Sequence, residues 1–185
     1  MSISQTKKFE AEVDIPQNVN VTLKNFMLSI DGPLGKTHKN FKKIPVNMNI
    51  NNNKIMLKAS GTRKKHYAIL NTAKSIIQIL CDGVIDGYTV KMKIISSHFP
   101  ITVKTDGKKV LIENFQGEKA PRVTRIWGES KVTPKGEDLI ITGHVLTDVT
   151  QTAAEIQNGT KVKNKDHRVF LDGVYRYFKS KGIEK

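Results

Sequence analysis

The chain repeats one order of elements, and this internal duplication limits its possible folds more than any other feature. The run Val21–Lys24 recurs as Ile101–Lys104, 80 residues later, and a glycine-lysine loop follows each run. A helical pattern ends both copies, with Thr72-Ala73 matched by Thr152-Ala153, again 80 residues apart. Because self-similarity at a fixed spacing is the signature of a repeated structural unit, we expect two copies of one small fold.

Two periodicities predict the elements of each copy. Val19, Val21 and Leu23 alternate with polar residues, as in a strand with one buried face, and Tyr88–Ile95 begins the second copy in the same way. The first helix has one apolar stripe and is predicted to stop at Gly83; the stripe contains Ile69, Ala73, Ile76, Ile77, Leu80 and, at a core position, Cys81.

The second helix is predicted to start at Asp148, where Gln151 completes the spacing of a capping box, and to bury Val149, Ala153 and Ile156. The predicted fold class is therefore α+β, with two tandem homologous small domains, each an antiparallel β-sheet covered by one α-helix. We place these domains at residues 1–87 and 88–185.

The charge indicates a polyanionic partner. Thirty-one Lys and Arg against 17 Asp and Glu leave a net charge of +14, and each predicted domain carries +7. Net charge of this size could serve solubility alone, yet a basic surface is also what binds phosphate backbones.

The sequence lacks the residues that several classes of function require. One cysteine excludes a disulfide scaffold, the five histidines show no metal-ligand spacing, and we find no catalytic constellation, so neither metal nor cofactor is predicted. No apolar run reaches the roughly 20 residues of a membrane span, and no signal-peptide pattern is visible, so we expect a cytoplasmic protein without membrane or small-molecule partners.

A short glycine motif leaves one alternative open. Gly35-Lys36-Thr37 lacks the earlier glycine of a phosphate-binding loop, since that position is Ile30. Gly32–Gly35 resembles the Gly-x-x-Gly clamp of KH domains, although here it follows a strand pattern instead of lying between helices. The alternative is thus a free-standing module that binds single-stranded RNA through this loop.

Cations gather in two segments of the second half. In residues 114–125, Gly117 and Pro121 are expected to bend a rigid loop that carries three cations. Residues 161–179 interleave cations with aromatic rings; Phe170 and its neighbour Leu171 are predicted to be buried, whereas Tyr175 and Tyr177 are predicted to lie at a solvated boundary. The predicted RNA-binding residues are Lys119, Arg122, Arg125, Lys161, Lys163, Lys165, Arg168, Tyr175, Arg176 and Lys179. Weaker candidates lie in the first half: Lys36, Arg63, Lys64 and Lys65.

Motifs spread along nearly the whole chain resemble one family. They are Val13–Pro16, Gly32-Pro33 with Gly35, Tyr88 with Lys91-Met92, His98–Ile101, Asn114-Phe115 with Gly117–Lys119, and Val162–Asp166 through Arg168, Phe170, Asp172-Gly173 and Tyr175. In this order they resemble the universal large-ribosomal-subunit protein six family, in its eukaryotic and archaeal branch, called protein L nine in eukaryotes.

The resemblance implies two copies of a small α+β fold in a structural protein of the cytosolic large subunit. It also implies binding to large-subunit ribosomal RNA near the sarcin-ricin loop and the stalk base, beside neighbouring ribosomal proteins. Three positions depart from the family pattern. Leu34 occupies a position that usually carries a basic residue, Asn158 replaces a glutamine, and Arg176 replaces an apolar residue.

The leading hypothesis is an RNA-binding structural protein of the large ribosomal subunit. It places the stronger RNA site in residues 88–185, whereas the alternative places it in residues 1–87. An enzyme that acts on RNA is a distant third hypothesis, because no acid, base, nucleophile or metal set is present.

Overall fold

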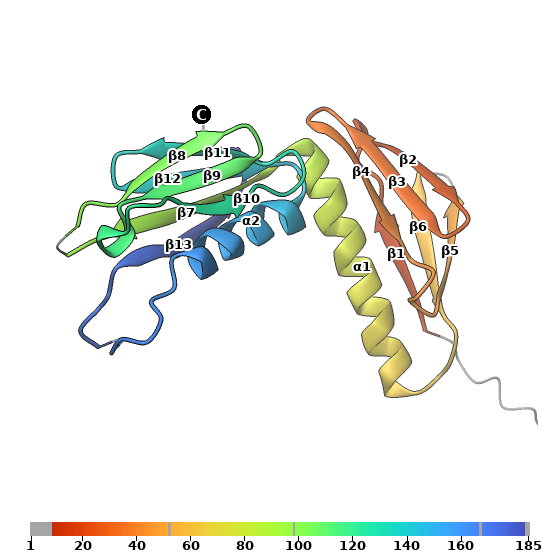
Figure 1. Cartoon of the computed structure of the whole chain (residues 1–185). Helices are drawn as coiled ribbons and strands as arrows, with labels where there is room; N and C mark the ends of the chain where they lie inside the picture. Colours follow the sequence, from red (N-terminus) through yellow and green to blue (C-terminus); the bar gives the residue numbers. More distant parts are fainter. Residues whose placement is uncertain (1–8, 52, 98, 167, 184–185) are drawn as a thin grey trace, which may run out of the picture. The chain divides into compact units, whose positions relative to one another are not determined.

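The computed structural model describes residues 9–51, 53–97, 99–166 and 168–183, which form two compact units, Met1–Ile85 and Asp86–Lys185 (Figure 1). Each unit has its own hydrophobic core. The units are therefore described separately.

The first unit holds two antiparallel three-stranded sheets and one helix, with strand orders β1-β6-β5 and β2-β3-β4. Its elements are β1 (Glu10–Asp14), β2 (Asn20–Lys24), β3 (Met27–Gly32), β4 (Gly35–Asn40), β5 (Val46–Asn51), β6 (Lys54–Ala59) and α1 (Lys64–Ile85). The helix contacts strands of both sheets, so its apolar stripe closes the core between them.

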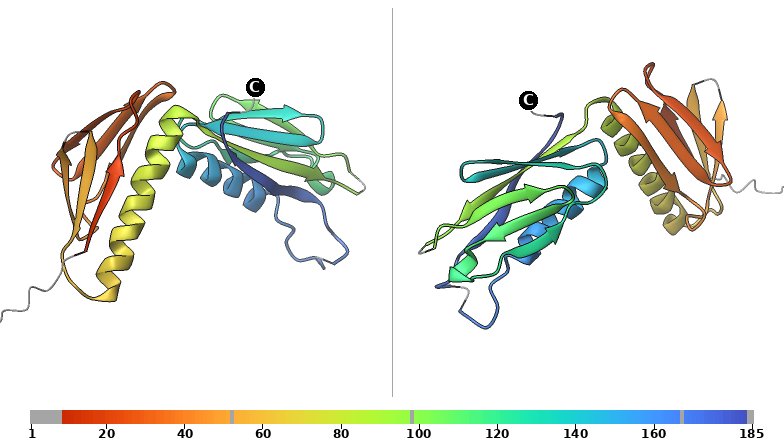
Figure 2. Two further views of the ribbon diagram at one scale, coloured as in Figure 1. Left: turned by 180° about the vertical axis from the view of Figure 1, so that it is seen from behind. Right: turned by 45° about the horizontal axis from the view of Figure 1, so that its top comes forward.

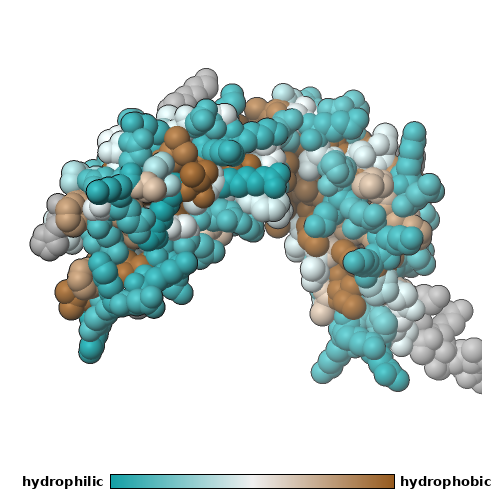
Figure 3. Space-filling model, viewed as in Figure 1, coloured by the Kyte–Doolittle hydropathy of each residue, from teal (hydrophilic) through white to brown (hydrophobic). Residues whose placement is uncertain are grey.

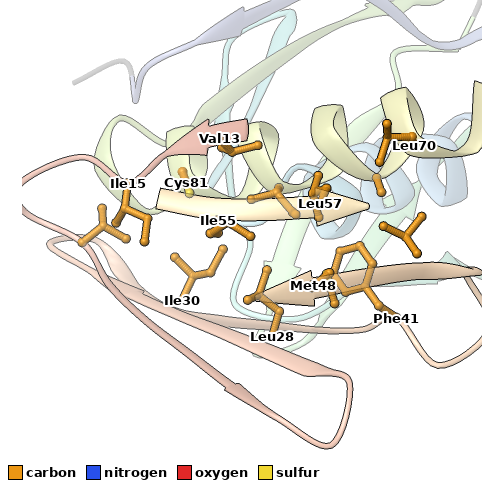
Figure 4. Close-up of a cluster of buried hydrophobic side chains, with 14 of the residues drawn as sticks. Val13, Ile15, Leu28, Ile30, Phe41, Met48, Ile55, Leu57, Leu70 and Cys81 are labelled. Atoms are coloured by element: carbon orange, nitrogen blue, oxygen red, sulfur yellow. The ribbon is translucent and has the colours of Figure 1, made fainter. Parts of the chain in front are cut away.

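The core of the first unit forms where the inward faces of both sheets meet α1 (Figure 4). Leu28 and Ile30 of β3, Ile55 of β6 and Ile77 of α1 are fully buried. Cys81 lies among them, as its position on the helical stripe predicts.

The predicted helix stop at Gly83 is wrong. Gly83 is a buried residue inside α1, which continues to Ile85. The chain turns at Gly87 instead, where φ is +73°, a value that glycine adopts without steric cost and that commonly follows a helix.

By length and composition alone, α1 could cross a membrane. This corrects the expectation that no apolar segment is long enough. In the structure, one face of this helix, with Leu70, Ala73 and Ile77, is buried against the two sheets, and 33% of its most apolar 18-residue window is buried.

The second unit holds a three-stranded antiparallel sheet, a four-stranded antiparallel sheet and one helix, with strand orders β10-β9-β8 and β11-β12-β7-β13. Its elements are β7 (Tyr88–Ile95), β8 (Thr102–Asp106), β9 (Lys109–Glu113), the 3-10 helix η1 (Phe115–Gly117), β10 (Arg122–Arg125), β11 (Lys131–Lys135), β12 (Asp138–Gly143), α2 (Leu146–Gly159) and β13 (Gly173–Lys181). The helix lies against β10 of one sheet and against β7, β12 and β13 of the other (Figures 1 and 2).

The prediction for α2 is right about its buried face and wrong about its start. Val149, Ala153 and Ile156 are buried as expected. The helix begins at Leu146, however, and its N-cap Val145 makes no side-chain cap hydrogen bond, so there is no capping box at Asp148. Thr152, also buried, accepts a hydrogen bond from the Trp127 backbone N–H (3.0 Å) and ties α2 to the end of β10.

The α+β class is confirmed, but each unit contains two sheets instead of one. Alternation in a sequence shows that a strand has one buried face, and it does not show which strands pair. That the two units are duplicated copies of one domain stays a prediction, as do the boundaries at residues 87 and 88.

Candidate nucleic-acid interface

Arg122, at the start of β10, joins the two cationic segments of the second unit. Its Nη1 donates hydrogen bonds to the carbonyl oxygens of Gly159 (2.9 Å) and Lys161 (3.3 Å), just where α2 ends. Its Nε donates to Glu118 (2.8 Å), and the guanidinium lies 4.1 Å from the centroid of the Phe115 ring. Residues 114–125 and 161–179, which are far apart in the sequence, therefore meet at this side chain.

Most N–H donors of Arg122 are used inside the protein, which changes its expected role. Both Nε and Nη2 of Arg122 donate to the Glu118 carboxylate, and these hydrogen bonds lower the pKa of Glu118. Only 25% of the Arg122 side chain is exposed. Arg122 therefore holds the surrounding segments in place. Sequence reasoning missed Glu118, although its distance of four residues from Arg122 is a spacing at which opposite charges often pair.

The bend predicted before β10 is present. Asn114, Gln116 and Gly117 have left-handed φ values of 58°, 52° and 78°. A Cβ atom added at Gly117 would lie 3.3 Å from the ring of Phe99, so this turn also needs the space that glycine leaves. Lys119 follows the turn as an exposed residue.

Arg125 does not join the other two cations of that segment. Thr124 is buried against the end of α2, where a Cβ at Gly159 would approach its methyl group, and Arg122 points the same way. Since side chains alternate along a strand, Arg125 lies on the opposite face of β10, with its guanidinium 5.0 Å from the ring centroid of Trp127. The expectation of three cations on one loop is therefore wrong, because two of them belong to a strand.

The segment between α2 and β13 displays lysines because alternate residues anchor it. Thr160 and Val162 are buried, and the Thr160 hydroxyl accepts a hydrogen bond from the Val174 N–H (3.0 Å). The intervening residues Lys161 and Lys163, and also Lys165, are exposed. Hydrophilic side chains dominate this part of the surface (Figure 3).

Lys165 links this segment back to η1. Its charge contributes to the lowered pKa of Glu118, and its Nζ lies 4.7 Å from the ring centroid of Phe170. We call Lys119, Lys161, Lys163 and Lys165 the lysine cluster; it lies around the contact made by Arg122.

The charge of Arg168 is partly balanced by Asp166. Its guanidinium donates to both carboxylate oxygens of Asp166 (3.2 and 3.0 Å), which raises the pKa of Arg168. The side chain is 89% exposed, and exposed ion pairs contribute little to stability, so a phosphate can compete with Asp166.

The apolar residues of this segment are less buried than predicted. Val169 and Leu171 are more than half exposed, and Phe170 is half-buried. The run lies in a connection outside the sheets, where no alternation applies. Tyr175 and Tyr177 are exposed, as their hydroxyl groups suggest.

Strand β13 places its predicted site residues on two sides. Arg176 and Lys179 pair with Met92 and Val90 of β7, on the side of α2, whereas Tyr175 pairs with Lys93 on the other side. Arg176 also lines a shallow hollow with Asn158, so two of the three departures from the family pattern are neighbours in space.

The weaker candidates of the first unit are not brought together. Lys36 lies near the turn between β3 and β4. A hydrogen bond from the Leu34 N–H to the Val84 carbonyl (3.0 Å) ties this turn to the end of α1. Arg63–Lys65 lie at the start of the same helix, whose 22 residues span about 33 Å. The Gly32–Gly35 loop is a hairpin turn, and a Cβ at Gly32 would lie 2.7 Å from Val84 Cγ2, so this loop does not have the setting of a KH clamp.

Within the described ranges, no three His, Cys, Asp or Glu side chains gather as a metal ion would require. Burial raises the pKa of the Cys81 thiol to about 11, which leaves it protonated and unreactive at neutral pH.

Comparisons with known proteins agree on one family. The family model described as ribosomal protein L6 matches residues 99–173. The large ribosomal subunit protein uL6 of Staphylothermus marinus is 43% identical over 170 residues, which cover 90% of this chain and 92% of the relative. The proteins of the same name from Methanobrevibacter smithii and Archaeoglobus fulgidus are 39% and 34% identical, over 89% and 94% of this chain and 92% and 91% of their own lengths.

Proposed function

Because the chain belongs to the uL6 family of large-ribosomal-subunit proteins, whose members are structural and not enzymes, we propose that it holds large-subunit ribosomal RNA through the lysine cluster. The chain is a ribosomal protein of the translation machinery. Its proposed role is to bind this RNA and hold it in position.

One observation carries this proposal: Arg122 fastens two segments that are remote in sequence, and the four lysines around that contact are exposed. A surface held in shape before binding loses little conformational freedom when RNA docks. Lysine ammonium groups neutralise phosphates and release counterions, which supplies affinity without reading base sequence. Such a surface suits the backbone of folded RNA.

The location within the subunit is a finer proposal. The family resemblance favours the region of the sarcin-ricin loop and the stalk base, with neighbouring ribosomal proteins, in cytoplasmic ribosomes. Hydroxyl-radical footprinting of reconstituted large subunits tests it, since protection confined to other RNA helices would contradict this placement.

The salt dependence of RNA binding tests the lysine cluster. In the triple variant Lys161→Ala, Lys163→Ala, Lys165→Ala, the slope of log K against log salt for a structured large-subunit RNA fragment should flatten by about 2–3. The matched control is Lys36→Ala, Lys64→Ala, Lys65→Ala, which removes the same charge from the first unit and should leave the slope nearly unchanged.

The control also tests the alternative function. A free-standing module that binds single-stranded RNA at Gly32–Gly35 predicts the reverse, with loss of binding in the control and none in the cluster variant. Nothing in the geometry favours that reading, because the loop packs against the end of α1.

A further inference from the structure

Three aromatic side chains gather on one face of the four-stranded sheet because β13 contains a bulge. Tyr175 pairs with Lys93 and Phe178 with Lys91, while the register shifts between Arg176 and Phe178 and leaves Tyr177 as the extra residue. Such a bulge turns adjacent side chains to the same face of a sheet. The Tyr177 hydroxyl reaches Asp138 (3.3 Å) on β12, which places this ring on the same face too.

This face is the outer one. Val90 and Met92, which alternate with Lys91 and Lys93 along β7, are fully buried on the α2 side. The view from behind in Figure 2 shows the sheet from the side opposite α2. The three rings are exposed there, at 39% for Tyr175, 56% for Tyr177 and 45% for Phe178.

The ring of Tyr175 lies over the backbone of Gly173. A Cβ atom added at Gly173 would lie 2.9 Å from Cε2 and 3.0 Å from Cζ and Oη of that ring. The strand thus covers the ring from one side and leaves its other side accessible, which is the arrangement that a stacking partner needs.

The charge around the rings is mainly positive. Lys91 Nζ lies 5.4 Å from the centroid of Phe178, and Lys93 pairs with Glu137 (3.1 Å) and Asp138 (3.6 Å). By the strand register, Lys131 and Lys135 of β11 share this face. Four lysines against two carboxylates leave this face with a net positive charge, so a protein partner packed here would bury more ammonium groups than carboxylates, which is costly. Phosphates would pair with these ammonium groups.

We propose that this face, defined by Tyr175, Tyr177, Phe178, Lys91 and Lys93, is a platform on which unpaired bases of the ribosomal RNA stack. The inference rests on the proposed function and adds a second mode of contact, since the lysine cluster holds phosphates and the platform holds bases. Aromatic rings stack with any base, so the platform tolerates many sequences.

The test compares two probes on the full chain: a short unstructured oligoadenylate and an oligomer of equal length that lacks bases. Tyr175→Ala or Phe178→Ala should raise the Kd for oligoadenylate roughly 5- to 150-fold and leave the Kd for the base-free oligomer nearly unchanged. Tyr175→Phe, which keeps the ring, is the matched control and should bind like the parent chain.

A second measurement avoids variants that could fail to fold. Phe178→Trp in a Trp127→Phe background keeps a flat ring and reports stacking, so oligoadenylate should quench its fluorescence and the base-free oligomer should not. Equal quenching by both probes, or ring variants that bind oligoadenylate as tightly as the parent, would overturn the platform. If the structured RNA fragment then still showed its dependence on the lysine cluster, the proposed function would stand.

Discussion

At the scale of single residues, the role of a cationic side chain depends more on its hydrogen-bond partners than on the number of cations around it. Arg122 and Lys163 look alike in the sequence, yet Arg122 donates to Glu118, Gly159 and Lys161 while Lys163 faces solvent. These partners come from segments up to 39 residues away. A sequence can place a cation in a basic segment, but only the fold decides whether its donors are already used.

Replacing Arg122 should therefore affect stability before binding. Arg122→Lys keeps the charge but loses the planar fork that holds Glu118 and two carbonyl groups at once. We expect a loss of about 1–2 kcal/mol in the free energy of unfolding of the second unit, measured by urea denaturation. Lys163→Ala is the control, and equal stability of both variants would contradict a structural role for Arg122.

The Glu118 contact should also depend on pH. Because the pKa of Glu118 is lowered in the folded chain, its contribution is present above the carboxyl's ordinary pKa and is lost as pH falls through the folded value. Since Glu118 is partly exposed, we expect a contribution of at most about 1 kcal/mol. Urea unfolding of the parent chain and Glu118→Gln should differ at pH 7 and converge in acid; a constant difference would exclude this ionic contribution.

Cys81 offers a probe of the first core. With a buried thiol and a pKa of about 11, it should react with a thiol reagent at pH 8 only when the first unit opens. Native chain should react many times more slowly than chain in denaturant, as followed by absorbance. Fast reaction of the native chain would show that α1 does not seal this core.

At the scale of elements, the sequence predicted the strands and helical faces better than their ends and partners. The alternation in Tyr88–Ile95 predicted β7, and the stripe with Ile77 predicted the buried face of α1. Gly83 did not stop the helix, because burial inside the core outweighs the low helix propensity of glycine. The bulge in β13 left no readable signal, since it depends on the register with β7.

The close approach of α2 to β10 gives a prediction at this scale. A Cβ at Gly159 would lie 2.5 Å from Thr124 Cγ2, so Gly159→Ala should push the end of α2 away and cost about 1–3 kcal/mol of unfolding free energy. Thr124→Ser removes that methyl group and should restore most of the loss in the double variant, measured as a double-mutant cycle. Additive effects of the two substitutions would mean that the contact is absent.

At the scale of the whole molecule, the two units carry similar net charges, +8 and +6, but differ in where that charge lies. The first unit spreads Lys36 and Arg63–Lys65 toward opposite ends of α1, whereas the second gathers its lysine cluster around one contact. Net charge and segment composition predicted a polyanionic partner, and the family motifs predicted which one. Neither the charge nor the motifs could show which unit gathers its cations at one place, because clustering is a property of the folded surface.

Weakening the first core should therefore spare RNA binding. Ile77→Ala removes a fully buried side chain from α1 and should destabilise the first unit by about 2–5 kcal/mol. The Kd for the structured RNA fragment should change less than twofold below the unfolding temperature, by filter binding. A large loss of affinity would mean that the first unit takes part in RNA binding.

The most direct measurement is sedimentation of large ribosomal subunits after a high-salt wash, with three forms of the chain assembled into them. The parent chain and the variant Lys36→Ala, Lys64→Ala, Lys65→Ala should stay with the subunit, while the variant Lys161→Ala, Lys163→Ala, Lys165→Ala should be released to the top of the gradient. Retention of the lysine-cluster variant together with release of the other would contradict the account.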